Sequence, residues 1–169
     1  MANNCSYNIR VVAKDAEAIK RVFDIMRYKD KEFYLYRVFS VEREFGLHER
    51  PWKGGFFYAD FFGDVAWGCD RWINDNPDME NKSETGAHYS TFVEICKALS
   101  VGVEIFAEEE GCGFQEHFIV NHDGEVVCAE CANWTCEYDE DTGERLSETG
   151  GVKGYMEWSD CNEIYGEEV

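Results

Sequence analysis

Residues 91–106, TFVEICKALSVGVEIF, predict a helix that runs directly into a strand, and this pair decides the fold. Thr91 and Glu94 have the spacing of a capping box, in which each side chain accepts a hydrogen bond from the other residue's backbone amide. The helix that begins there has an apolar stripe made of Phe92, Ile95, Cys96 and Leu99. From residue 101 onward the period changes to two, which predicts a strand over residues 101–106.

The same periods recur on the N-terminal side of this pair. Residues 7–11 alternate as a strand, and residues 15–28 carry apolar side chains at helical spacing. Residues 33–41 and 56–62 are rich in aromatic and β-branched residues, which predicts two more strands. The expected order is therefore β-α-β-β-α-β. That order is typical of the ferredoxin-like class of α+β folds, an antiparallel sheet with two helices on one face.

The C-terminal part of the chain predicts added hairpins. Residues 114–120 and 125–138 flank the turn sequence NHDG of residues 121–124. Residues 139–143 form a longer expected loop with Gly143 in the left-handed conformation, and residues 155–158 are expected to form a last strand. We therefore expect one domain over residues 1–169, with a ferredoxin-like core at 1–107 and an acidic β-hairpin extension at 108–169. The connection before residue 91 contains a turn signal at Asn76-Pro77.

Negative charge is concentrated in the C-terminal part of the chain. Residues 101–169 contain 19 Asp and Glu against two basic residues, Arg145 and Lys153, a net charge of −17. Residues 1–100 contain 16 acids against 14 bases, a net of −2, and the two sum to −19. Such a surface is repelled by nucleic acid and by anionic membranes and attracted to basic protein surfaces.

The composition indicates a folded protein of a reducing compartment. The chain is 44% hydrophobic and 15% aromatic, which is enough for a core and unlike an acidic disordered tail. No run of about 18 apolar residues is present, so no membrane span is expected. The N-terminus lacks the basic and apolar stretches of a secretory signal. Eight cysteines without such a signal indicate reduced thiols and a cytoplasmic location.

Three stretches of the chain resemble those of a known family. They are MANNCSYN at residues 1–8, WGCDRW at residues 67–72, and the stretch from Thr91 through Ile105 to Gly113-Phe114. They are similar to an uncharacterised ferredoxin-like family carried by phages and plasmids, whose members often open Met-Ala-Asn-Trp-Cys and carry Trp-Gly-x-Lys-Trp. Here Asn4 replaces Trp, Arg71 replaces Lys, and the acidic tail is a further departure. The resemblance, over residues 1–125, implies a fold and a mobile-element origin, and it implies no activity.

The cysteines offer one candidate metal site. Cys128-x-x-Cys131-x4-Cys136 has the opening spacing of a zinc knuckle, and Cys112 could supply a fourth ligand, as could His117, His122 and Cys161. However, Asp141 stands at the position where a zinc knuckle would carry its last cysteine. On a strand, Cys128 and Cys131 would also point to opposite faces. The alternative is that these cysteines are small buried side chains, so no cofactor is expected.

Motifs for catalysis are absent from the sequence. Asp139-x-Asp141-x-Gly143 lacks the glycine and glutamate positions of a calcium-binding EF-hand loop, so a hairpin loop is expected there. No Ser or Cys lies in a recognisable nucleophile motif, and no Gly-rich phosphate loop is present. With 35 acids, pairs of carboxylates arise by chance. The chain is therefore not expected to be an enzyme.

The acidic residues of the C-terminal part form the candidate binding surface. Same-face side chains on a strand repeat about every 6.8 Å, and duplex DNA carries a phosphate about every 3.4 Å per strand. Carboxylates on two or three neighbouring strands can therefore approach the charge density of DNA. Aromatic residues among them are candidate anchors, or alternatively the core of the added hairpins. The predicted partner-binding residues are Glu104, Glu108, Glu109, Glu110, Glu116, Glu130, Glu137, Asp139, Glu140, Asp141, Glu144, Trp134 and Tyr138.

These observations favour a phage or mobile-element protein that binds and inhibits a nucleic-acid-binding defence protein in the host cytoplasm. The expected target is a CRISPR effector or a restriction enzyme, bound through an acidic surface that mimics DNA. No direct contact with nucleic acid or membrane is expected. The first alternative is a zinc-stabilised accessory module that binds proteins and uses Cys128, Cys131, Cys136 and one more ligand. Two others are an enzyme on the ferredoxin-like scaffold and a protein whose charge serves only solubility.

Overall fold

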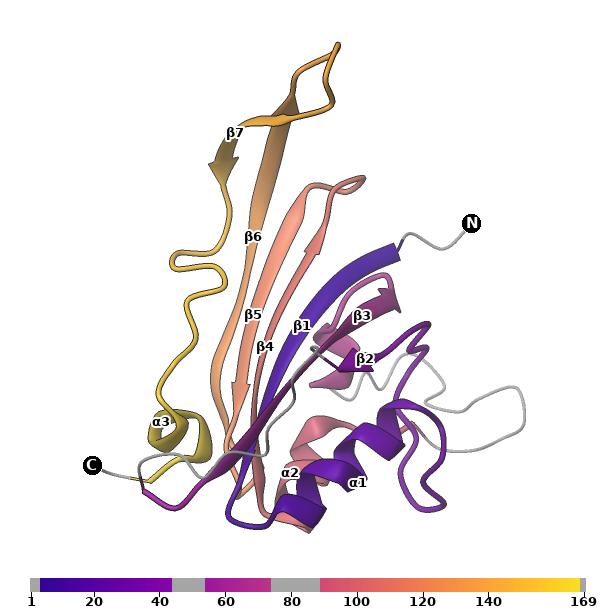
Figure 1. Ribbon diagram of the computed structural model, residues 1–169, viewed down its shortest axis with the longest axis vertical. Helices are drawn as coiled ribbons and strands as arrows, with labels where there is room; N and C mark the ends of the chain where they lie inside the picture. Colours follow the sequence, from indigo (N-terminus) through magenta and orange to yellow (C-terminus); the bar gives the residue numbers. More distant parts are fainter. Residues whose placement is uncertain (1–3, 44–53, 74–88, 168–169) are drawn as a thin grey trace.

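An antiparallel sheet of seven strands, in the order β2-β3-β1-β4-β5-β6-β7, organises the molecule (Figure 1). It is seen in a computed structural model that describes residues 4–43, 54–73 and 89–167. The strands are β1 (Asn4–Ala13), β2 (Glu42–Arg43), β3 (Phe57–Ala66), β4 (Val101–Glu109), β5 (Phe114–Val120), β6 (Val126–Tyr138) and β7 (Arg145–Gly150). The helices are α1 (Ala16–Met26), α2 (Phe92–Leu99), α3 (Cys161–Tyr165) and the single 3-10 turn η1 (Asp70–Trp72). The predicted α+β class is confirmed.

The predicted helix–strand pair forms as its sequence dictates. The backbone amide of Thr91 donates to Glu94 Oε2 at 2.8 Å, and that of Glu94 donates to Thr91 Oγ1 at 3.4 Å, which completes the capping box of α2. The helix ends at Ser100, whose left-handed conformation (φ 52°) turns the chain into β4. β4 then lies between β1 and β5, so it is a central strand of the sheet.

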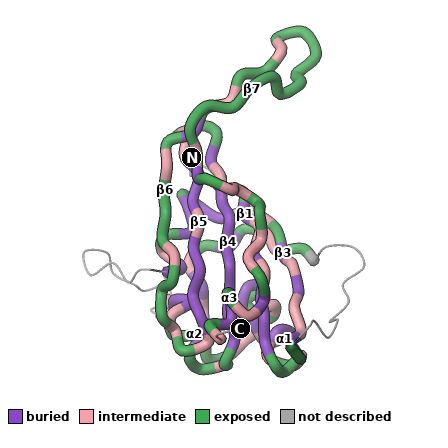
Figure 2. The backbone as a smooth tube through the Cα atoms, turned by 90° about the vertical axis from the view of Figure 1, so that its left-hand side faces the viewer, coloured by how far each residue is buried: buried purple, intermediate pink, exposed green. Residues whose placement is uncertain are grey.

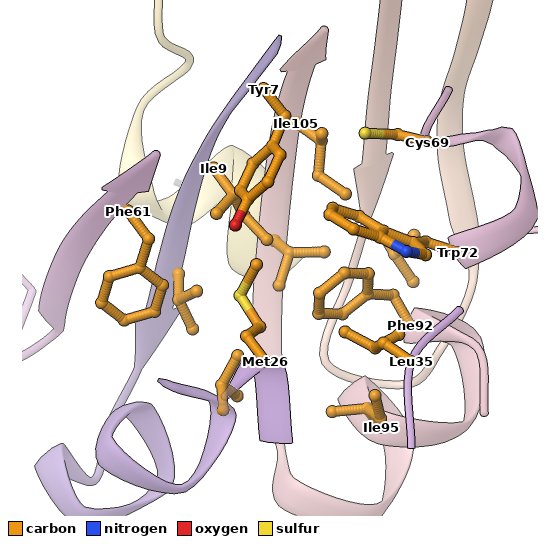
Figure 3. Packing of buried hydrophobic residues seen from close by; sticks show 14 of the residues in the cluster. Tyr7, Ile9, Met26, Leu35, Phe61, Cys69, Trp72, Phe92, Ile95 and Ile105 are labelled. Atoms are coloured by element: carbon orange, nitrogen blue, oxygen red, sulfur yellow. The ribbon is translucent and has the colours of Figure 1, made fainter. Parts of the chain in front are cut away.

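The main core lies between the sheet and the helices α1 and α2, which cover the same face. Alternate residues of β1 and β4, such as Ile9 and Ile105, meet the apolar stripes of the two helices (Figure 3). Trp72 is fully buried among them and contacts the rings of Tyr7 and Phe92 edge-on, at centroid distances of 4.9 and 5.9 Å. Its indole N–H donates to the carbonyl oxygen of Tyr36 at 2.8 Å, so the ring is buried without an unpaired donor.

The C-terminal residues 151–167 cover part of the second face of the sheet. Ile164 and Tyr165 of α3 pack with Val12 and Phe56 in a smaller apolar cluster. Gly102 makes this contact possible, because a Cβ there would lie only 2.4 Å from the carbonyl oxygen of Ile164. β4 is therefore buried on both faces, and eight of its nine residues are buried (Figure 2).

Two predicted strands do not form. Residues 33–41 contain only isolated bridges, at Leu35 and Val38, and Arg37 adopts a positive φ of 37° that interrupts any ladder. Leu35 and Val38 are buried in a loop, whereas Phe39 is 52% exposed. The aromatic and β-branched composition of this stretch therefore did not indicate an extended backbone. Residues 155–158 form turns, and the short helix α3 that follows them was not predicted.

The sheet therefore departs from the expected ferredoxin-like form. Its second strand is reduced to the two residues of β2, and β5, β6 and β7 continue the sheet beyond β4. The turn signal at Asn76-Pro77 lies outside the described residues. No helix in the described part of the chain has the length and apolar character that a membrane crossing requires.

Gly102→Ala tests the packing of α3 on the sheet. The added methyl group would collide with the carbonyl of Ile164, so we expect α3 to shift and the protein to lose about 1–3 kcal/mol of stability. Urea unfolding measures the loss, and amide exchange at Ile164 and Gly166 reports the helix. The exposed substitution Glu163→Ala is the control. Wild-type exchange in Gly102→Ala would contradict this packing.

Candidate functional site

Three of the predicted surface carboxylates are buried. Glu104, Glu109 and Glu116 have 0%, 5% and 4% of their surface exposed. Their assignment to a binding surface is therefore wrong. A buried carboxylate needs hydrogen-bond donors, and each of the three has them within the fold.

Glu104 joins three separate parts of the chain. His117 Nε2 lies 2.8 Å from Glu104 Oε1, and the backbone amide and hydroxyl of Ser159 both donate to the carboxylate at 2.9 Å. The His117 ring also stacks on Phe106, with centroids 4.3 Å apart and planes 7° apart. Glu104 therefore orients His117 and holds the C-terminal segment against the sheet.

Glu109 and Glu116 support turns next to the opposite face. Glu109 accepts hydrogen bonds from the amides of Gly111 and Cys112 and so closes the β4–β5 turn. Glu116 accepts from the amide of Cys69 at 2.7 Å. Burial, with the charge of nearby Asp70, raises the pKa of Glu116 to about 7.

Part of the outward charge lies on a projecting hairpin, residues 134–150, which we call the acidic arm. The pairing of β6 with β5 ends at Asn133, and from Trp134 onward β6 pairs only with β7. The arm therefore extends past the edge of the main sheet (Figure 1). All six residues of β7 are exposed, and the arm is exposed along most of its length (Figure 2).

The arm contains six acids and one base, a net charge of −5. Glu140, Asp141 and Glu144 are exposed, and their carboxylates have no hydrogen-bond or ion-pair partner among the described residues. Asp139 accepts from the amides of Asp141 and Thr142 at 2.9 and 2.7 Å, which shapes the tip and lowers the pKa of its own carboxyl. Glu137, also exposed, accepts from Ser147 across the hairpin.

Trp134 is the base of the arm rather than a binding anchor. It is 1% exposed, which contradicts the predicted surface role. Its backbone amide donates to Gly113 in the β4–β5 turn at 2.7 Å. The guanidinium of Arg145 lies 4.8 Å from the centre of its ring and is also paired with Glu148 at 2.6 Å. The only base of the arm is thus held against the arm itself.

Two apolar side chains of the arm remain accessible. Tyr138 is 41% exposed, and its hydroxyl donates to Glu110 on the β4–β5 turn at 2.6 Å. Leu146 on β7 is 62% exposed and was not predicted as a site residue. Its position as the single large apolar residue between the loop and Gly150 was the signal that could have identified it.

The remaining predicted partner-binding residues lie on the main sheet, outside the acidic arm. Glu108 is partly exposed and lies 3.3 Å from Gln115 Nε2 and 4.0 Å from Arg145 Nη2. Glu130 is exposed on β6, directly opposite His117 of β5. Glu108 therefore stands between the arm and the sheet, whereas Glu130 belongs to the sheet edge.

The predicted set of four cysteine ligands does not converge. Cys128 and Cys131 point to opposite faces of β6, as alternation requires. Cys136 is contacted by Arg145 Nε at 2.9 Å, and Cys112 lies in the β4–β5 turn. Within the described residues, the one group with metal-ligand geometry is instead His117, Cys128 and Glu130. Partial burial and the carboxylates of Glu130 and Glu104 raise the pKa of the Cys128 thiol, so it is not activated as a nucleophile.

Comparison with protein-family models, with curated proteins and with solved structures finds no match for this chain. Its function is therefore inferred from its own residues.

The Glu116 carboxyl predicts a pH dependence of stability. Its pKa of about 7 in the folded protein exceeds the ordinary value of 4.5, so the folded state binds the proton more tightly. Stability should fall as pH rises from about 5 to 7, by on the order of 3 kcal/mol at most. Glu116→Gln should remove this decline, as measured by urea unfolding at each pH. The exposed substitution Glu140→Gln should keep it. An unchanged slope in Glu116→Gln would refute the assignment.

Removal of the Trp134 ring should release the acidic arm. An isolated hairpin is marginally stable, so Trp134→Ala should raise amide exchange in residues 135–149 by about tenfold or more. Exchange in β1 and β4 should change much less. Leu146→Ala removes an apolar side chain that packs on little and should leave the arm protected. Equal effects of the two substitutions would argue against Trp134 as the base.

Proposed function

We propose that the protein binds a basic, nucleic-acid-binding surface of another protein through its acidic arm and thereby competes with nucleic acid. The observation that carries the proposal is the set of exposed carboxylates of Glu140, Asp141 and Glu144, which have no partner among the described residues. A carboxylate without an internal cationic partner is available to pair with a basic surface of another protein. The projection of the arm makes this charge accessible to a concave site (Figure 1).

The charges of the arm come from both of its strands and from its tip. Glu137 lies on β6, and its cross-strand neighbour is Ser147, while Glu148 on β7 lies opposite Cys136. Successive residues of a strand point to opposite faces, so these two carboxylates project from opposite faces of the hairpin. Asp139, Glu140, Asp141 and Glu144 lie in the tip that joins the strands. The arm therefore presents negative charge on both faces and at its end.

The accessible apolar side chains supply anchors beside the charge. Interfaces depend on a few aromatic or large apolar residues, and surface charge mainly speeds association and selects the partner. Tyr138 and Leu146 are exposed within the arm. Their combination with carboxylates fits a protein partner better than a solvated surface that serves only solubility.

The target class that we propose is a host defence nuclease, such as a CRISPR effector or a restriction enzyme. The resemblance of residues 1–125 to a ferredoxin-like family of phages and plasmids supports this class, because mobile elements encounter such enzymes. In this proposal the protein is not an enzyme, acts in the host cytoplasm and makes no direct contact with nucleic acid. Residues 1–107 would be a ferredoxin-like variant in which the second strand is shortened to β2.

Charge reversal on the arm tests the proposal. The triple variant Glu140→Lys, Asp141→Lys and Glu144→Lys adds six charges and changes the net charge from −19 to −13. The matched control reverses three exposed acids elsewhere, Asp24, Glu157 and Glu163, with the same change in net charge. Each protein is immobilised and incubated with purified CRISPR effectors and restriction enzymes, with and without duplex DNA, at low and high salt.

We expect the wild type and the control to retain an effector and to inhibit its cleavage of DNA, and excess duplex to displace that effector. The arm variant should lose at least about tenfold in affinity, because each removed contact contributes on the order of 1 kcal/mol. Binding that survives arm reversal, or that duplex DNA does not displace, would contradict mimicry by the arm.

A further inference from the structure

Three potential metal ligands meet on the face of β5 and β6 that the C-terminal segment flanks. His117 and Glu130 are directly opposite each other in the β5–β6 register, and Cys128 lies two residues before Glu130 on the same face. His117 Nδ1 lies 3.5 Å from Cys128 Sγ, and the ligand atoms of all three residues lie within 4.8 Å of one another. His117 and Cys128 are partly buried, whereas Glu130 is exposed.

The imidazole is held in the orientation that metal binding requires. Its Nε2 lies within hydrogen-bond distance of Glu104 Oε1, at 2.8 Å. Glu104 is itself fully buried and accepts a hydrogen bond from the backbone amide of Ser159. The stack with Phe106 fixes the ring plane. A histidine that donates one ring N–H to a carboxylate presents the lone pair of its other nitrogen, which is the usual support of a metal-ligating histidine. Nδ1 of His117 therefore faces Cys128 as an acceptor.

We propose that His117, Cys128 and Glu130 bind a divalent zinc-type ion, with Glu104 as the outer carboxylate that orients His117. In a tetrahedral zinc site with Zn–S of about 2.3 Å and Zn–N of about 2.0–2.1 Å, the S···N edge is about 3.5 Å, which is the observed Sγ···Nδ1 distance. The exposed Glu130 side chain needs only a rotation to close the third position. Binding releases the Cys128 thiol proton to solvent.

The ligand set selects the class of metal. One thiolate, one imidazole and one carboxylate suit zinc and related transition metals, whereas calcium and magnesium prefer oxygen ligands alone. Three protein ligands leave a fourth position for water or for a side chain of another molecule. The site is separate from the acidic arm, so it does not depend on the proposed function of the arm.

The same atoms also have the order of a nucleophile, a base and an orienting carboxylate in Cys128, His117 and Glu104. Glu130 distinguishes the two interpretations. A carboxylate beside the thiol attracts a cation. Without a bound cation, its negative charge disfavours the thiolate that a nucleophile needs. The metal site is therefore the better supported of the two.

Cobalt titration of the full chain, freed of metal by a chelator, tests the site. We expect one Co²⁺ per chain with a thiolate-to-cobalt charge-transfer band, displaced by one equivalent of Zn²⁺. Cys128→Ser should abolish the band, and Glu130→Gln should weaken Co²⁺ binding by about tenfold or more. Glu104→Gln should weaken it by about 10–100-fold, as outer-sphere substitutions do. Cys131→Ser is the matched control, because it removes an exposed thiol from the other face of β6.

Circular dichroism establishes that each variant is folded, and Cys128→Ser keeps the inference testable if Glu104→Gln does not fold. The inference is overturned by a band that persists in Cys128→Ser, or by less than stoichiometric Co²⁺ and Zn²⁺ at micromolar concentrations. A third result would also overturn it: iodoacetamide alkylates Cys128 rapidly, and neither Co²⁺ nor Zn²⁺ slows the reaction. That result would favour the interpretation of Cys128 as a nucleophile.

Discussion

The buried carboxylate of Glu104 is the constraint on which the C-terminal half of the structure depends. It lies fully buried at the centre of the sheet, directly opposite Arg10 of β1 in the β1–β4 register. A carboxylate in that position is stable only when its oxygens are hydrogen-bonded. His117 and Ser159 supply these bonds. The same contacts fix a histidine on β5 and hold the C-terminal segment over the second face of the sheet.

This constraint divides the acidic residues into two groups with different roles. Those on the central strands, such as Glu104 and Glu116, accept hydrogen bonds from backbone amides and side chains inside the fold. Those on the acidic arm face solvent, because β6 leaves the sheet after Asn133 and carries no layer on either side. The negative charge of residues 101–169 therefore includes carboxylates that support the fold and carboxylates that are available for a partner.

Local signals in the sequence predicted local structure well. The capping box and the change of period at residue 100 placed α2 and β4, and the NHDG turn placed β5 and β6. The burial of Glu104 was not predictable in this way, because its partner Ser159 lies 55 residues away. The group of His117, Cys128 and Glu130 depends on the β5–β6 register, which shifts at Ile119/Val120. Neither a long-range contact nor an irregular register is visible in a short window of sequence.

The protonation of the His117 ring tests the role of Glu104 most directly. Long-range ¹H–¹⁵N correlation spectra of the metal-free protein at pH 8 distinguish the two ring nitrogens. If Glu104 orients His117 as described, the spectrum should show a proton on Nε2 and none on Nδ1, with the opposite ring form absent. A proton on Nδ1, or rapid exchange between the two forms, would contradict the account.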